Sequence, residues 1–143
     1  MSYLVDTNVL SELRRRQPDS RVVAWFSGRP ASSLFISVLT LGEIRKGIEG
    51  VTDAARRLRL SDWLEAELPA FFSGRVLPID AAVAERWGRL LGAAGRPVAA
   101  VDSLLAATAL HHELQMVTRN RADFAFPGLD VIDPWGMGSG LAS

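Results

Sequence analysis

The chain has 143 residues, of which 48% are hydrophobic and 22% charged, and its formal net charge is zero. This length and balance are typical of one globular domain with a buried core, and they exclude a mainly disordered chain. The chain has no cysteine, which excludes disulfide scaffolds, zinc–cysteine sites and thiol catalysis.

The first half of the chain predicts two short strands, each followed by helical segments. In chain order these are a strand at 3–5, a helix at 8–16 that Pro18 ends, a helix that Asp19 or Ser20 caps and that stops at Gly28, a strand at 34–38, and a helix at 40–49 closed by Gly50. Proline and glycine mark these ends because proline cannot continue a helix and glycine readily leaves the helical conformation.

The second half continues the alternation. It predicts a helical segment at 53–72 that Pro69 kinks or divides, a strand at 76–79 that Pro78 makes irregular or places at an edge, a helix capped by Asp80 and ended near Gly92 or Gly95, an almost wholly apolar helix at 99–113, and strands at 115–118 and 129–132. Strands separated by helices indicate parallel pairing and a sheet covered on both faces. We therefore predict an α/β fold with a mostly parallel sheet of about five short strands, spanning 1–134, and a flexible Gly/Ser-rich tail at 135–143.

The ends of the chain and its apolar stretches bear on location. Residues 1–6 have no basic segment and only three consecutive apolar residues, which is not the pattern of a signal peptide. No stretch approaches the roughly 20 apolar residues needed to cross a bilayer. We therefore expect a cytoplasmic protein that makes no use of a membrane.

Four acidic residues occupy related positions. Asp6 ends the first strand, Glu43 follows the second and Asp123 follows the fourth, while Asp102 opens the most apolar helix. Ligands in open α/β sheets bind at the carboxyl ends of the strands, so we expect these side chains to converge. Carboxylates that share a small site raise one another's pKa or bind cations. Oxygen ligands suit Mg²⁺ or Mn²⁺, which can activate water for in-line attack on a phosphodiester.

Each acid also has a purely structural explanation. Asp6 can cap the first helix, and Thr40–Glu43 matches a capping box. Asp102 can stabilise a helix N-terminus through the dipole, and Asp123 can form an Asx turn. The residues alone leave these roles and metal binding open.

Two other groups of residues have both a functional and a structural interpretation. The arginine clusters, 14–16 and 56–59, can contact phosphates, although solvated helix faces are the simpler explanation. Trp25, Trp63, Trp87 and Trp135 can stack on bases, but packing in a core or dimer is more usual. Asp80 is interpreted as a helix cap and not as part of the site.

Four segments carry the acids and their neighbours: Leu4–Val9 (LVDTNV), Ser37–Ile44 (SVLTLGEI), Asp102–Ala109 (DSLLAATA) and Thr118–Phe124 (TRNRADF). In this order and spacing, over about residues 3–133, the sequence resembles the PIN-domain superfamily, and within it the VapC-like toxins of type II toxin–antitoxin pairs. The resemblance implies a three-layer α/β/α nuclease fold whose metal-binding, catalytic acids are Asp6, Glu43, Asp102 and Asp123. Their polar neighbours would be Thr7, Asn8, Thr118 and Asn120.

The resemblance also implies a function and partners. It implies a Mg²⁺- or Mn²⁺-dependent endoribonuclease that leaves a 5′-phosphate and a 3′-hydroxyl, forms a homodimer, and binds a cognate antitoxin that alone contacts DNA. The alternative is a binding module that represses its own operon within an antitoxin complex, with little or no nuclease activity. In that case the helical segment 53–72 would offer apolar surface to the antitoxin.

Overall fold

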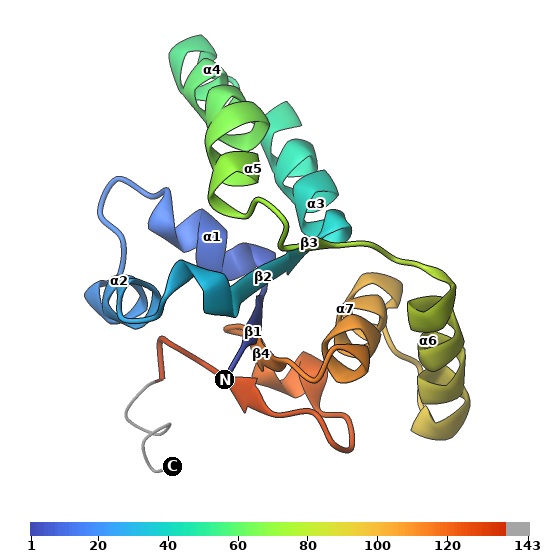
Figure 1. Cartoon of the computed structure of the whole chain (residues 1–143). Helices are drawn as coiled ribbons and strands as arrows, with labels where there is room; N and C mark the ends of the chain where they lie inside the picture. The colour runs from blue at the N-terminus through green and yellow to red at the C-terminus, as the bar shows by residue number, and fades with distance from the viewer. Residues whose placement is uncertain (137–143) are drawn as a thin grey trace.

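Figure 1 shows a computed structural model of the chain, which describes residues 1–136. Its centre is a five-stranded sheet in the order β3-β2-β1-β4-β5, and every neighbouring pair is parallel. The strands are β1 (Tyr3–Val5), β2 (Leu34–Ser37), β3 (Val76–Leu77), β4 (Gln115–Val117) and β5 (Val131–Ile132). The prediction of about five short parallel strands is confirmed.

Helices cover both faces of this sheet (Figure 1). One face carries α1 (Thr7–Leu13), α2 (Ser20–Ser27), α3 (Val38–Glu49), α4 (Ala54–Asp62) and α5 (Leu68–Phe71), and the other carries α6 (Ala81–Ala94) and α7 (Ala100–His111). Short 3-10 turns, η1 (Ala31–Ser33) and η3 (Arg121–Phe124), and a π-helical turn, η2 (Trp63–Glu67), complete the chain. The result is the predicted three-layer α/β/α arrangement.

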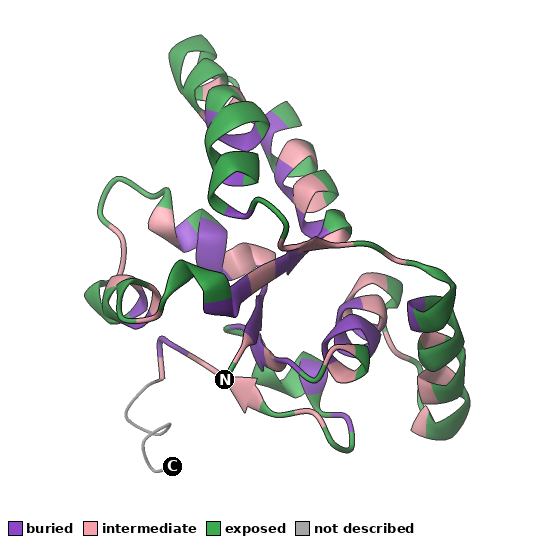
Figure 2. Cartoon of the chain, viewed as in Figure 1, coloured by how far each residue is buried: buried purple, intermediate pink, exposed green. Residues whose placement is uncertain are grey.

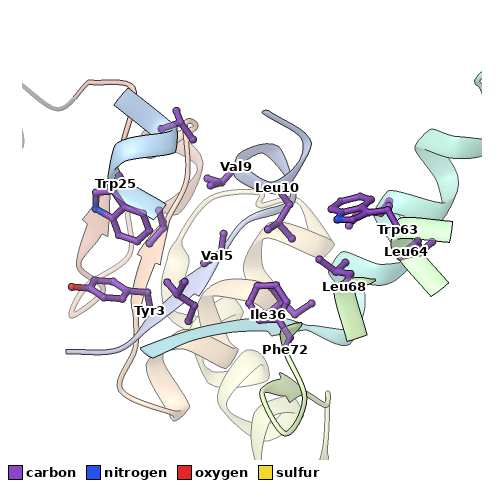
Figure 3. Packing of buried hydrophobic residues seen from close by; sticks show 14 of the residues in the cluster. Tyr3, Val5, Val9, Leu10, Trp25, Ile36, Trp63, Leu64, Leu68 and Phe72 are labelled. Atoms are coloured by element: carbon purple, nitrogen blue, oxygen red, sulfur yellow. The ribbon is translucent and has the colours of Figure 1, made fainter. Parts of the chain in front are cut away.

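Two hydrophobic clusters pack against the two faces of the sheet. Tyr3 and Val5 of β1 point into the cluster under α1–α5, whereas Leu4 points into the cluster under α7. This alternation follows from the two-residue period of a strand, and burial on both sides is usual for a parallel sheet. Figure 2 shows the buried residues concentrated along the central strands and the helix faces against them. Figure 3 shows side chains of the first cluster, where Trp63 and Leu68 lie toward Leu10 of α1 and Phe72 lies beside Ile36 of β2.

The order of the strands in the sheet places a topological switch point beside β1. From β1 the chain continues to β2 and β3 on one side, and it later returns to β4 and β5 on the other. The carboxyl ends of β1 and β4 therefore lie where the connections diverge. In open α/β sheets this topological switch point is where ligands bind.

Helices α1 and α3 have bounds that differ from the predicted ones. Helix α1 ends at Leu13 rather than at residue 16, because the Glu12 carboxylate accepts the backbone N–H of Asp19 at 2.8 Å and holds the following residues in a turn. Helix α3 begins at Val38, two residues early, because the Ser37 hydroxyl caps it by accepting the N–H of Leu39 at 3.0 Å. The capping box predicted for Thr40–Glu43 is therefore wrong, and Glu43 lies in the second turn.

The long helical segment is divided near Pro69, as predicted. Helix α4 passes through the π-helical turn η2 into α5, and the N–H of Leu68 bonds to the carbonyl of Trp63 five residues back. A proline lacks an N–H and its ring crowds the carbonyl four residues earlier, so the wider turn before it relieves both problems. Strand β3 is an edge strand that stops before Pro78, which also agrees with the prediction.

The C-terminal boundary needs one correction. Trp135, placed by prediction in a flexible tail, is 7% exposed and belongs to the first hydrophobic cluster. Its backbone N–H also donates to the Asp133 carboxylate at 2.8 Å. The folded domain therefore extends past 134, and the rest of the predicted tail, 137–143, lies outside the described residues. Within the part that the structure describes, no helix is long and apolar enough to cross a membrane.

Candidate active site

Asp6 lies at the centre of the switch point, at the end of β1, and is 7% exposed. One carboxylate oxygen accepts the N–H of Thr7 at 2.8 Å, so the predicted cap of the first helix is confirmed. The other oxygen accepts the hydroxyl of Thr118 at 2.7 Å. The same carboxylate therefore begins helix α1 and joins the ends of two neighbouring strands.

Thr118 connects the two segments that leave these strands. Its buried hydroxyl oxygen accepts hydrogen bonds from the Asn8 amide at 3.3 Å and from the backbone N–H of Asn120 at 3.0 Å. The Asn8 side-chain oxygen in turn accepts the N–H of Arg119 at 3.4 Å. The polar neighbours that the resemblance implied thus form one network that fixes the orientation of Asp6.

Glu43 reaches the same place from helix α3. The hydroxyl of Thr7 donates to its carboxylate at 2.6 Å, across 36 residues of sequence. Because Thr7 also donates its backbone N–H to Asp6, this one residue bridges two of the predicted acids. Asp6 and Glu43 are therefore brought together as predicted.

Asp102 lies in the first turn of α7 and is partly buried. Ala99 precedes the helix and makes no side-chain cap, so Asp102 is the acidic residue of the first turn, where a helix dipole favours negative charge. Among the described residues its carboxylate accepts no hydrogen bond, which leaves its oxygens available to a ligand.

Asp123 is placed differently from the other three. It is exposed on the turn η3, whose closing hydrogen bond joins the Asp123 backbone N–H to the carbonyl of Asn120 at 3.0 Å. It does not line the cleft over the other acids. Its charge nevertheless raises the pKa of Asp102, so the two carboxylates are electrostatic neighbours.

An open cleft of about 530 Å³ lies over the site. Its walls come from both segments that follow β1 and β4 and from helices α3, α4 and α7. The lining residues are Asp6, Thr7, Asn8, Ser11, Glu12, Arg15, Glu43, Arg56, Asp102, Arg119, Asn120 and Trp135.

Two carboxylates of the cleft, those of Asp6 and Asp102, resist ionisation. Burial raises the pKa of Asp6 from 3.8 to about 6, despite the hydrogen bonds from Thr118 and Thr7, which lower it. The charges of Glu43 and Asp102 raise it further. The pKa of Asp102 is also raised, first by burial and then by its acidic neighbours. A divalent cation would relieve this combination of desolvation and repulsion.

The donor set fits a hard cation by its chemistry. All the candidate ligands are carboxylate oxygens, which Mg²⁺ and Mn²⁺ prefer. Within residues 1–136, no three acidic or histidine side chains form a group compact enough to enclose a metal ion. Mg²⁺ commonly binds through one or two carboxylates and keeps several waters, so an open arrangement suits it better than a closed cage would.

The sequence interpretation missed several residues of the cleft. Glu12 is buried, Ser11 lines the wall, and Arg15, Arg56 and Arg119 surround the acids. The arginine clusters were interpreted as solvated faces, and two of their members in fact line the cleft. A signal was present, because positions 8, 11, 12 and 15 have helical spacing and are all polar.

Comparison with known proteins agrees with this fold. The PIN domain family model matches residues 3–126, and the chain belongs to that family. It is 35% identical over 135 residues to VapC ribonuclease Y4jK of Sinorhizobium fredii, covering 92% of this chain and 96% of that protein. It is 36% identical to toxin FitB of Neisseria gonorrhoeae, covering 92% and 97%. The crystal structure of FitAcB from Neisseria gonorrhoeae has a TM-score of 0.88 at 35% identity, covering 94% of this chain and 99% of that one.

These matches confirm the resemblance seen in the sequence. The chain is a VapC-like member of the PIN-domain family, with the α/β fold of that family. Solved proteins of similar fold include toxin–antitoxin complexes.

Proposed function

We propose that this chain is a metal-dependent endoribonuclease and the toxin of a toxin–antitoxin pair. The observation that carries the proposal is the meeting of Asp6, Glu43 and Asp102 at one cleft, with the pKa of Asp6 raised to about 6. Shifted carboxylates in a cleft at a switch point are the electrostatic setting of a functional site. A relative named VapC ribonuclease supports RNA as the substrate.

The proposed metal ligands are Asp6, Glu43 and Asp102, with Asp123 as the fourth acid on the adjoining turn. A bound Mg²⁺ or Mn²⁺ would activate the attacking water and neutralise charge on the phosphodiester, leaving a 5′-phosphate and a 3′-hydroxyl. The protein's own contribution is orientation. Thr118 holds one oxygen of Asp6 and Thr7 holds one oxygen of Glu43, and such partners of metal ligands commonly contribute 10–100-fold in activity or affinity.

Replacement of Asp6 or Asp102 by Asn tests the chemistry. We expect each change to reduce Mn²⁺-dependent cleavage of cellular RNA by roughly 10²-fold or more, because an amide is a poor ligand for a hard cation. Asp80→Asn is the matched control, because Asp80 caps α6 and Asn is an equally good cap. Cleavage is measured by sequencing RNA ends after brief expression and with purified protein in Mn²⁺ or EDTA. Full cleavage by both site variants would contradict the proposal.

We propose that the cognate antitoxin binds an apolar groove beside the segment 53–72. This groove, of about 290 Å³, lies between α1, α2, η2 and α5, and is lined by Leu10, Leu13, Arg14, Phe26, Trp63, Glu67, Leu68, Phe71 and Phe72. Phe71 is 41% exposed although it is large and apolar, and α4 beside it has no buried residue. Exposed apolar surface of this kind commonly marks a protein interface.

The remaining partner proposals follow from the family. We propose a cytoplasmic homodimer that reaches DNA only through its antitoxin, in keeping with a formal net charge of zero. Light scattering of the purified chain tests the dimer. The alternative, a binding module without nuclease activity, would be favoured if the antitoxin-free protein cleaves no cellular RNA in Mn²⁺.

A further inference from the structure

The acidic cleft contains three arginines that the proposed metal chemistry does not use. Arg15 follows α1, Arg56 belongs to α4 and Arg119 follows β4, so they come from three separate elements. Their convergence on one cleft is a product of the fold and not of a charge run in the sequence. Arginine matches phosphate geometry through two parallel hydrogen bonds.

Two of these arginines are held in place by a neighbour. The guanidinium of Arg15 lies 3.3 Å from the carboxylate of Glu12, which is itself buried. The guanidinium carbon of Arg119 lies 5.0 Å from the centre of the Trp135 ring, a cation–π contact. Both arginines line the cleft, and these contacts restrict their guanidinium groups, which reduces the entropy lost when they bind a ligand.

The negative charge of the cleft explains why a nucleic acid would need these arginines to bind there. The lining includes four carboxylates, of Asp6, Glu12, Glu43 and Asp102, which repel any phosphate that is not paired with a cation. Within the described part of the chain, Arg56 and Arg119 form no ion pair with a carboxylate. Their charge is therefore available to an incoming phosphate.

The geometry also separates these arginines along the cleft. Asn8, Ser11 and Glu12 lie on one face of α1, at positions i, i+3 and i+4, and Arg15 follows in the turn after the helix. At 1.5 Å per residue, α1 carries the chain roughly 10 Å from Asp6 to Leu13, and Arg15 lies just past that end of the helix. Arg119, by contrast, directly follows Thr118, which is hydrogen-bonded to Asp6. Arg119 is thus near the reacting phosphate, whereas Arg15 is suited to a phosphate further along the strand.

We propose that Arg15, Arg56 and Arg119 form a phosphate-binding rim that holds an RNA strand across the acidic cleft. The proposal rests on the proposed ribonuclease function, since it concerns the substrate of the same site. The rim contacts the backbone and not the bases, because the Trp135 ring is 7% exposed and its face is covered by Arg119. Backbone contacts strengthen binding without reading sequence.

The experiment measures RNA binding separately from cleavage. Fluorescence anisotropy with single-stranded oligouridylate and oligoadenylate, in EDTA and over a series of salt concentrations, gives the affinity and its salt dependence. We expect Arg15→Gln, Arg56→Gln and Arg119→Gln each to weaken binding by roughly tenfold for both oligonucleotides. Each should also reduce the slope of log affinity against log salt by about 0.7, the value for one contact to a single-stranded phosphate.

Sequence neighbours supply matched controls. Arg16→Gln and Arg57→Gln remove the same charge from residues that do not line the cleft, and Arg57 is already paired with Glu49. Both should bind RNA as the wild type does. Arg119→Lys keeps the charge but loses the planar group, and should recover only part of the affinity.

The outcomes separate this inference from the proposed function. If the Gln variants keep both affinity and salt slope while the wild type cleaves RNA in Mn²⁺, the rim is wrong and the ribonuclease proposal stands. If the variants lose affinity but the wild type never cleaves, the rim stands and the ribonuclease proposal fails. A wild type that binds no RNA, or controls that lose as much affinity as the rim variants, overturns the rim.

Discussion

At the scale of single residues, the site is built from side chains with two roles. Asp6 caps α1 and is also the buried carboxylate at the centre of the cleft. Thr7 gives its N–H to Asp6 and its hydroxyl to Glu43. The cap at Asp6 is therefore confirmed, and it is compatible with the proposed metal binding, because different faces of one carboxylate can serve each role.

The pKa of Asp6 predicts how the stability of the metal-free protein depends on pH. That pKa is raised from 3.8 to about 6, so the folded protein holds a proton at pH values where the unfolded chain has lost it. The resulting stabilisation is complete below about pH 4 and disappears as the pH rises through 6. At roughly 1.4 kcal/mol per pKa unit, its upper limit is about 3 kcal/mol.

We therefore expect the free energy of unfolding in EDTA to increase when the pH is lowered from 7 to 5, as measured by urea denaturation. Asp6→Asn should flatten this dependence, whatever its own stability. Asp19, whose pKa is lowered to about 2, acts in the opposite direction only at more acidic pH. A wild type that becomes less stable over this interval would contradict the assignment.

Residue-scale prediction from the sequence was successful where position follows from strand order. The ends of β1 and β2 place Asp6 and Glu43 at one edge, and their hydrogen bonds to Thr7 confirm that they meet. Asp102 joins them at the cleft. That Asp123 belongs to the site stays a prediction. It lies on a turn, and no periodic pattern in the sequence predicts which way a turn points.

At the scale of elements, capping residues decide where helices begin. They thereby decide which way the proposed metal-binding side chains on those helices point. Ser37 ends β2 and starts α3, so the helix begins directly at the strand. Sequence pattern placed this start at Thr40, because a capping-box motif is present there. The motif is not used, since Ser37 already supplies the cap. The apolar periodicity that predicted the helix is compatible with either start.

Ser37→Ala tests this cap. Loss of the hydroxyl that accepts the N–H of Leu39 should lower the free energy of unfolding by about 1 kcal/mol, the usual effect of removing a Ser cap. The measurement is urea denaturation at pH 7. Thr40→Val, which replaces the buried and unpaired hydroxyl of the unused motif by a methyl group of similar size, should cost clearly less if the cap is Ser37. An equal loss in both variants would argue against this start of α3.

At the scale of the whole molecule, two surfaces with different chemistry lie on either side of α1. The polar face of this helix borders the acidic cleft, and its apolar face borders the groove beside η2 and α5. One short helix thus separates the proposed catalytic surface from the proposed antitoxin surface. The parallel sheet and its layers were predictable from apolar patterning, whereas this division depends on how α4, η2 and α5 fold back onto α1.

The groove can be tested without disturbing the site. Phe71→Asp places a charge on the 41% exposed phenylalanine and should weaken binding to a co-expressed antitoxin by roughly 30-fold or more. Ala84→Asp adds the same charge to an exposed position of α6 and should leave that affinity unchanged. Calorimetry of the purified pair gives both values. An unaltered affinity for Phe71→Asp would place the antitoxin elsewhere.

The arginine run after α1 has a genetic consequence if both proposals hold. Arg14 lines the groove and contacts the Trp63 ring, whereas its neighbour Arg15 lines the cleft. Mutation of codon 14 would tend to release the protein from its inhibitor, and the cell that carries it would be lost. Mutation of codon 15 would weaken RNA binding and thereby toxicity, and that cell would survive. Adjacent codons would therefore experience opposite selection, and spontaneous survivors of toxin expression should carry changes at 15 far more often than at 14.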